Sequence, residues 1–140
     1  MTQPKPRRNG RVLVLGGYGA VGQVTARQLA RRMPGRVVVA GRDGERAARC
    51  AAGSGGALLA ARADLADTAS LERALDGVSL AVLTAEPPPG TAHPARLLFE
   101  RGIGLVDVTA THGLVRQVEN LVAGFVAPVD AAAAERRLVG

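Results

Sequence analysis

The sequence predicts an α/β fold, a doubly wound parallel sheet of about five strands in the order 3-2-1-4-5. Short apolar runs alternate with helical patterns five times, and the connections between them are short. The runs lack polar alternation, which is typical of strands buried on both faces of a parallel sheet. Right-handed crossovers between successive parallel strands then favour this strand order.

The predicted strands are runs rich in Val, Leu and Ala. They span residues 11–15, 36–40, 57–63, 80–84 and 105–108. Aromatic residues make up only 2% of the chain, so the core must be built from the same aliphatic residues. Their small side chains suit the close packing of helices on a sheet.

The segments after the strands show helical patterns. Val21, Thr25, Leu29 and Met33 recur every four residues and predict one face of the first helix, which the following Pro-Gly pair ends. In the last predicted helix the apolar positions are Leu114, Val118, Leu121 and Val122. The helices between these two are predicted at residues 45–52, 67–75 and 93–101.

The composition limits the partners that the chain can have. The net charge is +6, but the arginines are scattered and no aromatic residues interleave with them, so we expect no nucleic-acid partner. The single cysteine, Cys50, excludes an intrachain disulfide and a metal site built on thiolates. No segment reaches the ~18 apolar residues of a membrane span. The polar start does not resemble a signal peptide, so we expect a cytoplasmic protein without membrane contact.

A glycine-rich turn follows the first predicted strand and opens the first predicted helix. Its residues, which contain the pattern G-x-G-x-x-G, are Gly16, Gly17, Tyr18, Gly19, Ala20, Val21 and Gly22. In this pattern Gly17 allows a tight turn, Gly19 lets a pyrophosphate approach the backbone, and Gly22 lets the helix pack close to the strand. The alternative is a plain turn. The strand before it and the helix after it favour a dinucleotide-binding Rossmann domain.

The end of the second predicted strand indicates which dinucleotide binds. NAD enzymes usually place an acidic residue there, but the strand ends at Ala40 and Arg42 follows two residues later. A guanidinium at that position suits a 2′-phosphate, so we predict NADP rather than NAD. Arg42 as a plain surface charge is the alternative. Asp43 is a candidate ribose partner, although a helix cap is the favoured role.

Two further pairs of residues follow predicted strands and are candidate cofactor contacts. Asp64 has two equally supported roles, a hydrogen bond to the adenine amino group or the cap of a turn, and Leu65 is expected to pack on the adenine ring. Thr84 and Ala85 are expected to flank the middle of the cofactor, because ligands lie outside the carboxyl ends of the strands.

No catalytic residue can be assigned from the sequence. The short-chain dehydrogenase mechanism needs Tyr and Lys four residues apart, and the only Lys, Lys5, is far from the only Tyr. His93 is predicted in the first turn of a helix. His112, in the loop after the fifth strand, is either a proton-transfer group or polar surface. Thr109, which follows that strand, is a candidate contact to the cofactor or a substrate.

Residues 12–22, 38–42 and 104–109 together resemble the NADP-binding domain of the saccharopine dehydrogenase-like family, and the resemblance covers about residues 11–121. It implies an NADP-linked oxidoreductase with a separate substrate-binding domain. It also implies that cofactor contacts are made by six residues: Gly17, Tyr18, Gly19, Ala20, Val21 and Arg42.

We therefore expect a disordered basic lead-in at residues 1–10, a Rossmann domain at 11–123, and a short tail at 124–140 that is a truncated start of a substrate domain. The chain is interpreted as the NADP-binding domain of an oxidoreductase that lacks its substrate domain. The alternatives are a non-catalytic NADP-binding sensor or docking module, and the same fold with NAD or a nucleotide-sugar. The open edge of the fifth strand predicts a homo-oligomer, most simply a dimer.

Overall fold

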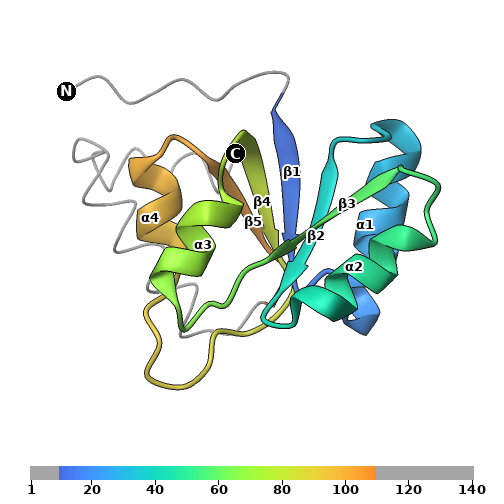
Figure 1. The fold of residues 1–140 in the computed structure, drawn as a ribbon. Coiled ribbons are helices and arrows are strands. Elements are labelled where there is room, and N and C mark those ends of the chain that lie inside the picture. Colours follow the sequence, from blue (N-terminus) through green and yellow to red (C-terminus); the bar gives the residue numbers. More distant parts are fainter. Residues whose placement is uncertain (1–9, 110–140) are drawn as a thin grey trace, which may run out of the picture. The chain divides into compact units, whose positions relative to one another are not determined.

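The apolar runs form parallel strands in the computed structural model, which describes residues 10–109. The strands are β1 (Arg11–Leu15), β2 (Val37–Gly41), β3 (Leu58–Arg62), β4 (Val78–Leu83) and β5 (Gly104–Asp107). They lie in the order β3-β2-β1-β4-β5, so the predicted order 3-2-1-4-5 is confirmed (Figure 1).

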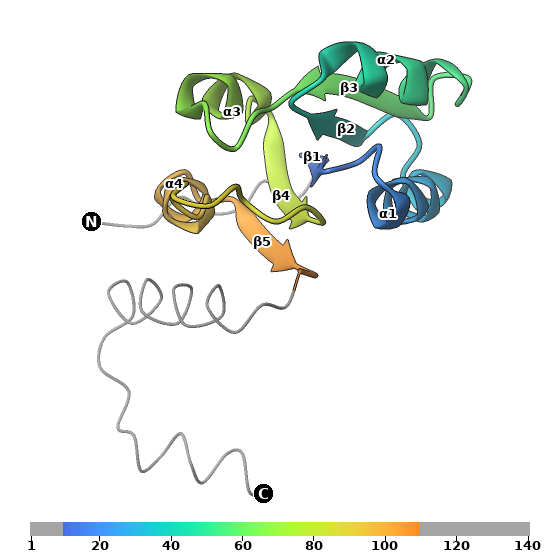
Figure 2. The same cartoon turned by 90° about the horizontal axis from the view of Figure 1, so that it is seen from below.

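Helices α1 (Ala20–Arg32), α2 (Gly44–Ala52), α3 (Thr68–Ala74) and α4 (Ala95–Glu100) connect these strands. The first two pack on one face of the sheet and the last two on the other (Figure 2). This division follows from right-handed crossovers, because the chain moves outward from β1 to β3 and then returns past β1 to β4. The topological switch point therefore lies between β1 and β4.

The core has two layers, one on each face of the sheet. Successive residues of β1 alternate between them, so that Leu13 packs with Leu98 on the α3–α4 face and Val14 packs with Val39 on the α1–α2 face. Among the described residues, the buried hydrophobic side chains are Val, Leu and Ala, with Ile103 as the exception. The prediction of an aliphatic core is therefore confirmed for this part of the chain.

The face of α1 predicted from the four-residue spacing is not the face that the helix buries. The prediction chose Val21 and the residues spaced four apart from it, but Val21 is 59% exposed. The buried residues are Gly22, Ala26 and Ala30, one position further along. Small residues face the sheet because the helix axis lies close to it, and the larger side chains Leu29 and Met33 pack from the flank.

Some predicted boundaries also change. β4 begins two residues earlier than predicted, because Val78 pairs with Arg11 ahead of an irregularity in the register. β2 ends at Gly41 rather than at Ala40. His93 was predicted in the first turn of α4, but it precedes the helix, whose N-cap is Pro94.

Several predictions lie outside the described residues. They concern residues 1–9 of the lead-in, His112, the helix with Leu114 and Val118, and the tail at 124–140. β5 is one edge of the described sheet, with Val106 and Val108 exposed. Self-association along this edge stays a prediction.

The approach of α1 to the glycine turn yields a prediction about stability. A Cβ at Gly22 would overlap the carbonyl oxygen of Gly16. We expect Gly22→Ala to lower the free energy of unfolding by about 3 kcal/mol, the cost of overpacking a rigid backbone contact. Urea denaturation measures this value. Gly53→Ala is the matched control, because a Cβ added there would have no neighbour within 4 Å; equal losses in the two variants would contradict the prediction.

Candidate functional site

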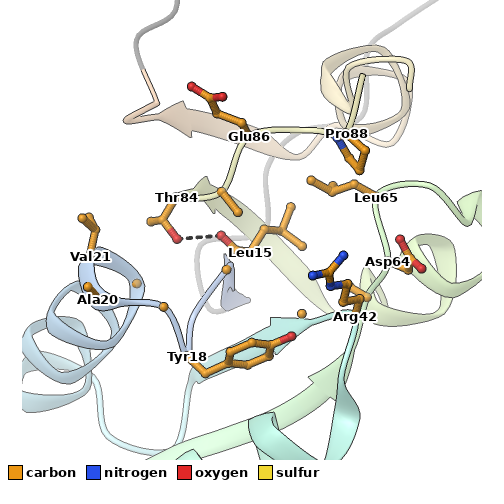
Figure 3. Close-up of a pocket in the computed structure, with 16 residues that line it drawn as sticks. Leu15, Tyr18, Ala20, Val21, Arg42, Asp64, Leu65, Thr84, Glu86 and Pro88 are labelled. Atoms are coloured by element: carbon orange, nitrogen blue, oxygen red, sulfur yellow. Dashed lines mark hydrogen bonds between the residues drawn. The ribbon is translucent and has the colours of Figure 1, made fainter. Parts of the chain in front are cut away.

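A cleft of about 470 Å³ lies at the carboxyl ends of the strands, beside the switch point between β1 and β4 (Figure 3). This is where parallel α/β sheets bind their ligands, and the volume suits a small molecule or cofactor. The structure brings together most of the predicted site residues here. Those that line the cleft are Gly16, Tyr18, Gly19, Ala20, Val21, Gly22, Arg42, Asp64, Leu65, Thr84 and Ala85.

Gly17 is the predicted site residue that does not line the cleft. A Cβ at this position would lie 2.8 Å from the Cβ of Val39 and 2.9 Å from the carbonyl oxygen of Val14. Gly17 therefore allows the turn to lie against β2. Its N–H donates to the carbonyl oxygen of Ala40, which also accepts from the N–H of Gly16.

The glycine turn leaves the start of α1 open to a ligand. Gly19 is the N-cap and provides no side-chain cap, and the first turn of the helix contains no acidic residue. A Cβ at Gly19 would meet only the carbonyl oxygen of Gly16, at 3.3 Å, and would otherwise enter open space. The backbone N–H groups of the first turn and the positive end of the helix dipole are therefore available to an anion in the cleft.

Tyr18 holds the glycine turn against the end of β2. Its hydroxyl oxygen accepts a hydrogen bond from the Asp43 backbone N–H at 3.0 Å, and its ring lies so close to Gly41 that a Cβ there would overlap it. Gln23 donates to the Tyr18 carbonyl oxygen at 2.7 Å, and the guanidinium of Arg46 stacks on the ring, 4.7 Å from its centroid. The only tyrosine of the chain is thus a structural clamp on the turn.

Arg42 directly follows β2 and points into the cleft (Figure 3). Its backbone carbonyl oxygen accepts from Nε of Arg62 at 3.2 Å, which holds this segment beside β3. Within residues 10–109 no carboxylate pairs with the Arg42 guanidinium. Asp43 caps α2, where its carboxylate accepts from the N–H groups of Glu45 and Arg46, so the favoured prediction for Asp43 is confirmed.

Asp64 and Leu65 form the cleft wall next to Arg42. One carboxylate oxygen of Asp64 accepts from the backbone N–H of Ala66 at 2.9 Å, which confirms the turn-capping role. The other lies 3.7 Å from the guanidinium of Arg62. A contact from Asp64 to adenine stays a prediction.

Thr84 joins the ends of the two strands at the switch point. Its hydroxyl donates to the carbonyl oxygen of Leu15 at 2.7 Å, and its backbone N–H donates to the same oxygen at 2.9 Å. Gly16, which follows Leu15 with φ +86°, has no room for a side chain because Thr84 and Ala85 lie against it. Thr84 and Ala85 therefore form the floor of the cleft beside the glycine turn.

Five residues line the cleft without having been predicted: Leu15, Gly41, Ala63, Glu86 and Pro88. The first three end or follow strands, so the rule that ligands lie at the carboxyl ends would have found them. Glu86 and Pro88 belong to the irregular loop after β4, where the sequence has no periodic signal. With Glu86 the cleft has a carboxylate at the opposite end from Arg42 (Figure 3).

A buried polar network ties the segment before α4 to the end of β5. His93, whose side chain is 2% exposed, accepts from the Ala95 N–H at Nδ1, so Nε2 carries the proton and donates to Asp107 at 3.1 Å. The N–H and hydroxyl of Thr109 donate to the other carboxylate oxygen of Asp107 at 2.8 and 2.6 Å. Thr109 does not line the cleft, and its contact with cofactor or substrate stays a prediction.

Two classes of feature are not found among residues 10–109. No group of three or more His, Cys, Asp or Glu side chains is placed to hold a metal ion. No helix in this range is both long enough and apolar enough to cross a membrane.

Comparisons with known proteins agree with this fold. The family model of the saccharopine dehydrogenase NADP binding domain matches residues 12–136. Among curated proteins, no match reaches significance.

Solved structures with the same fold include an NADPH-dependent quinone oxidoreductase from Escherichia coli in complex with NADPH, with 23% identity and a TM-score of 0.56 over 69% of this chain and 35% of that one. Triphenylmethane reductase from Citrobacter sp. in complex with NADP(H) has 17% identity and a TM-score of 0.55 over 79% of this chain and 43% of that one. At these identities the likeness shows the fold alone, and the chain spans less than half the length of either protein.

The fold and the cleft define a nucleotide-binding domain of the Rossmann type. Because the family model matches most of the chain, this protein belongs to the saccharopine dehydrogenase NADP-binding domain family, and its cofactor is NADP. The predicted resemblance and the predicted cofactor are therefore confirmed.

The network around Asp107 yields a prediction about pH. Burial raises the pKa of Asp107, but hydrogen bonds from Thr109 and His93 outweigh it and hold the pKa below its ordinary value. We expect Asp107→Asn to lower the free energy of unfolding by about 2 kcal/mol at neutral pH, since the new amide would turn an N–H group towards the His93 donor or leave its partners unpaired.

The stabilisation by the ionised Asp107 carboxylate should be fully present above the ordinary Asp pKa, about 4. It should disappear as the pH falls through the lowered pKa of Asp107 in the folded state. Urea denaturation of the parent and of Asp107→Asn from pH 7 to pH 3 measures the difference. Asp76→Asn, in an exposed turn, controls for the loss of a surface carboxylate. A difference that grows on acidification would contradict the prediction.

Proposed function

We propose that NADP lies across the cleft with its pyrophosphate against the first turn of α1 and its adenosine half towards Arg42. The observation that supports this most directly is that the glycine turn and Arg42 line one continuous cleft. A Cβ at Gly19 would fill part of this cradle, as expected where a backbone must approach a phosphate. Arg42, unpaired with any described carboxylate, suits the 2′-phosphate, and Thr84 and Ala85 lie towards the nicotinamide half.

We infer that the chain is the cofactor-binding part of an NADP-dependent oxidoreductase. When bound, NADP supplies or accepts the hydride, while the residues of this chain bind the cofactor and orient it. The opposite wall of the active site then comes from a substrate-binding part. The matched family, described as the NADP binding domain of saccharopine dehydrogenase, supports this division of roles.

The alternative is an NADP-binding sensor or docking module without catalysis. One observation favours it: Tyr18, the only tyrosine of the chain, uses its hydroxyl to hold the Asp43 N–H and acts as a clamp on the turn. The titratable groups that line the cleft besides Tyr18 are Arg42, Asp64 and Glu86. None of these forms the Tyr–Lys pair of short-chain dehydrogenases.

The first prediction from this proposal concerns cofactor choice. NADPH should bind more tightly than NADH, and Arg42→Ala should reduce that preference roughly tenfold, because a charge-assisted hydrogen bond to the 2′-phosphate is lost. Calorimetric titration with each cofactor measures both affinities. Arg73→Ala, an exposed charge on α3, is the control for net charge. Equal affinities of the parent for NADPH and NADH would contradict the assignment.

The second prediction concerns the glycine turn. Gly19→Val should abolish NADPH binding, because its side chain occupies the space of the pyrophosphate. The fold should survive, since the backbone at Gly19 is extended, with φ −73° and ψ 171°, and a Cβ has one close neighbour. Calorimetry and circular dichroism measure the two effects. A well-folded variant that binds as tightly as the parent would place the site elsewhere.

The third prediction distinguishes the oxidoreductase part from a complete enzyme. We expect this chain alone to bind NADPH without oxidising it in the presence of keto acids, imines or aldehydes, because the described residues that line the cleft offer no Tyr–Lys pair for proton transfer, and the wall that holds the substrate is proposed to come from another part. The loss of NADPH absorbance measures its oxidation. Substrate-dependent oxidation that vanishes in Gly19→Val would show that the chain is catalytically sufficient.

A further inference from the structure

A second hollow, of about 540 Å³, lies between α1 and α2. It shares Tyr18 with the cofactor cleft, since that residue lines both. Its residues come from two helices and from the loop that leads to β3, so the sequence shows no single motif for it. None of the functions described so far uses this hollow.

Three arginines surround the hollow: Arg27 from α1, and Arg46 and Arg49 from α2. No acidic side chain lines it, and no ion pair joins any of the three to a carboxylate within residues 10–109. Arg27 instead donates to the side-chain oxygen of Gln23 at 3.3 Å, and Arg46 stacks on Tyr18. Like charges gathered around a concave surface create a positive potential that attracts an anion.

The hollow is not uniformly polar. Leu58, which is 5% exposed, and the half-buried side chains of Tyr18 and Cys50 contribute apolar surface, and all three belong to the core cluster under α1 and α2. Ser54, also in the lining, already donates to the Ala51 carbonyl oxygen and accepts from the Leu58 N–H. The neutral part of the hollow therefore suits an apolar group, while the arginines suit its charged substituent.

We propose that this hollow binds a small organic phosphate, with the phosphate held by Arg27 and Arg49 and its apolar body placed on Tyr18, Cys50 and Leu58. Arginine is suited to this role because its planar group donates two parallel hydrogen bonds to phosphate oxygens. The hollow is a site separate from the NADP cleft. Because Tyr18 lines both cavities, the test must distinguish binding in the hollow from binding in the cleft.

The test is a titration of the ¹⁵N-labelled full chain with phenyl phosphate, followed by NMR in the presence of saturating NADPH. The cofactor occupies the cleft, so a phosphate bound there by the glycine turn is excluded. We expect saturable shifts of the backbone amides of Cys50 and Gly53, which line the hollow, and none beyond background at Gly19. Inorganic phosphate should bind more weakly, because it lacks the apolar body.

Two double variants with the same change in net charge separate a built site from general attraction. Arg27→Ala/Arg49→Ala should weaken phenyl phosphate binding about tenfold, because charge-assisted hydrogen bonds are lost. Arg31→Ala/Arg32→Ala removes two charges from the last turn of α1, outside the hollow. This variant should change the affinity for phenyl phosphate by less than about twofold in physiological salt. All four side chains are exposed, so both variants should fold.

Equal weakening in the two variants would overturn the proposal, since it would show long-range attraction only. Absence of saturable shifts at the hollow would also overturn it, and inorganic phosphate binding as tightly as phenyl phosphate would overturn the assigned ligand class. If NADPH itself failed to bind, the proposed cofactor role would fail. The titration without NADPH would still report on the hollow, because its amides are distinct from those of the glycine turn.

Discussion

The start of α1 lies so close to the turn after β1 that only hydrogen atoms fit between Gly22 and the carbonyl oxygen of Gly16. This contact sets the position of the helix over the sheet, and with it the small buried face of Gly22, Ala26 and Ala30. It also directs the first turn of the helix at the switch point between β1 and β4. The location of the cleft, and the open N–H groups that face it, follow from this one approach.

A second set of contacts fixes what surrounds that turn. Tyr18 joins it to the end of β2, and Thr84 joins β1 to β4 by two bonds to one carbonyl oxygen. At the edge of the sheet next to β4, His93 and Asp107 connect the segment before α4 to β5. The ends of β1, β2 and β4, which border the cleft, are thus held by side-chain hydrogen bonds as well as by the ladder, which pre-organises the walls before any ligand arrives.

The parts of the fold that were predictable are those encoded by local pattern. Continuous apolar runs indicated the strands, and the spacing from the glycine turn to Arg42 indicated the cofactor. The buried face of α1 could not be recognised from the sequence because Ala and Gly carry little hydrophobic signal, although they pack closest to the sheet. The pairing of His93 with Asp107 joins residues 14 apart. The arginines of the second hollow come from different helices. Such juxtapositions depend on the packing of elements and leave no period in the sequence.

The chain has no tryptophan and one tyrosine, Tyr18, which forms a wall of both the cofactor cleft and the arginine-lined hollow. Its ring is also in contact with a guanidinium, and its hydroxyl oxygen holds a backbone N–H. The ultraviolet emission of the protein therefore comes almost entirely from one fluorophore at the place where ligands are expected. Without any label, its intensity reports on events at the wall between the two cavities, undiluted by signals from the core.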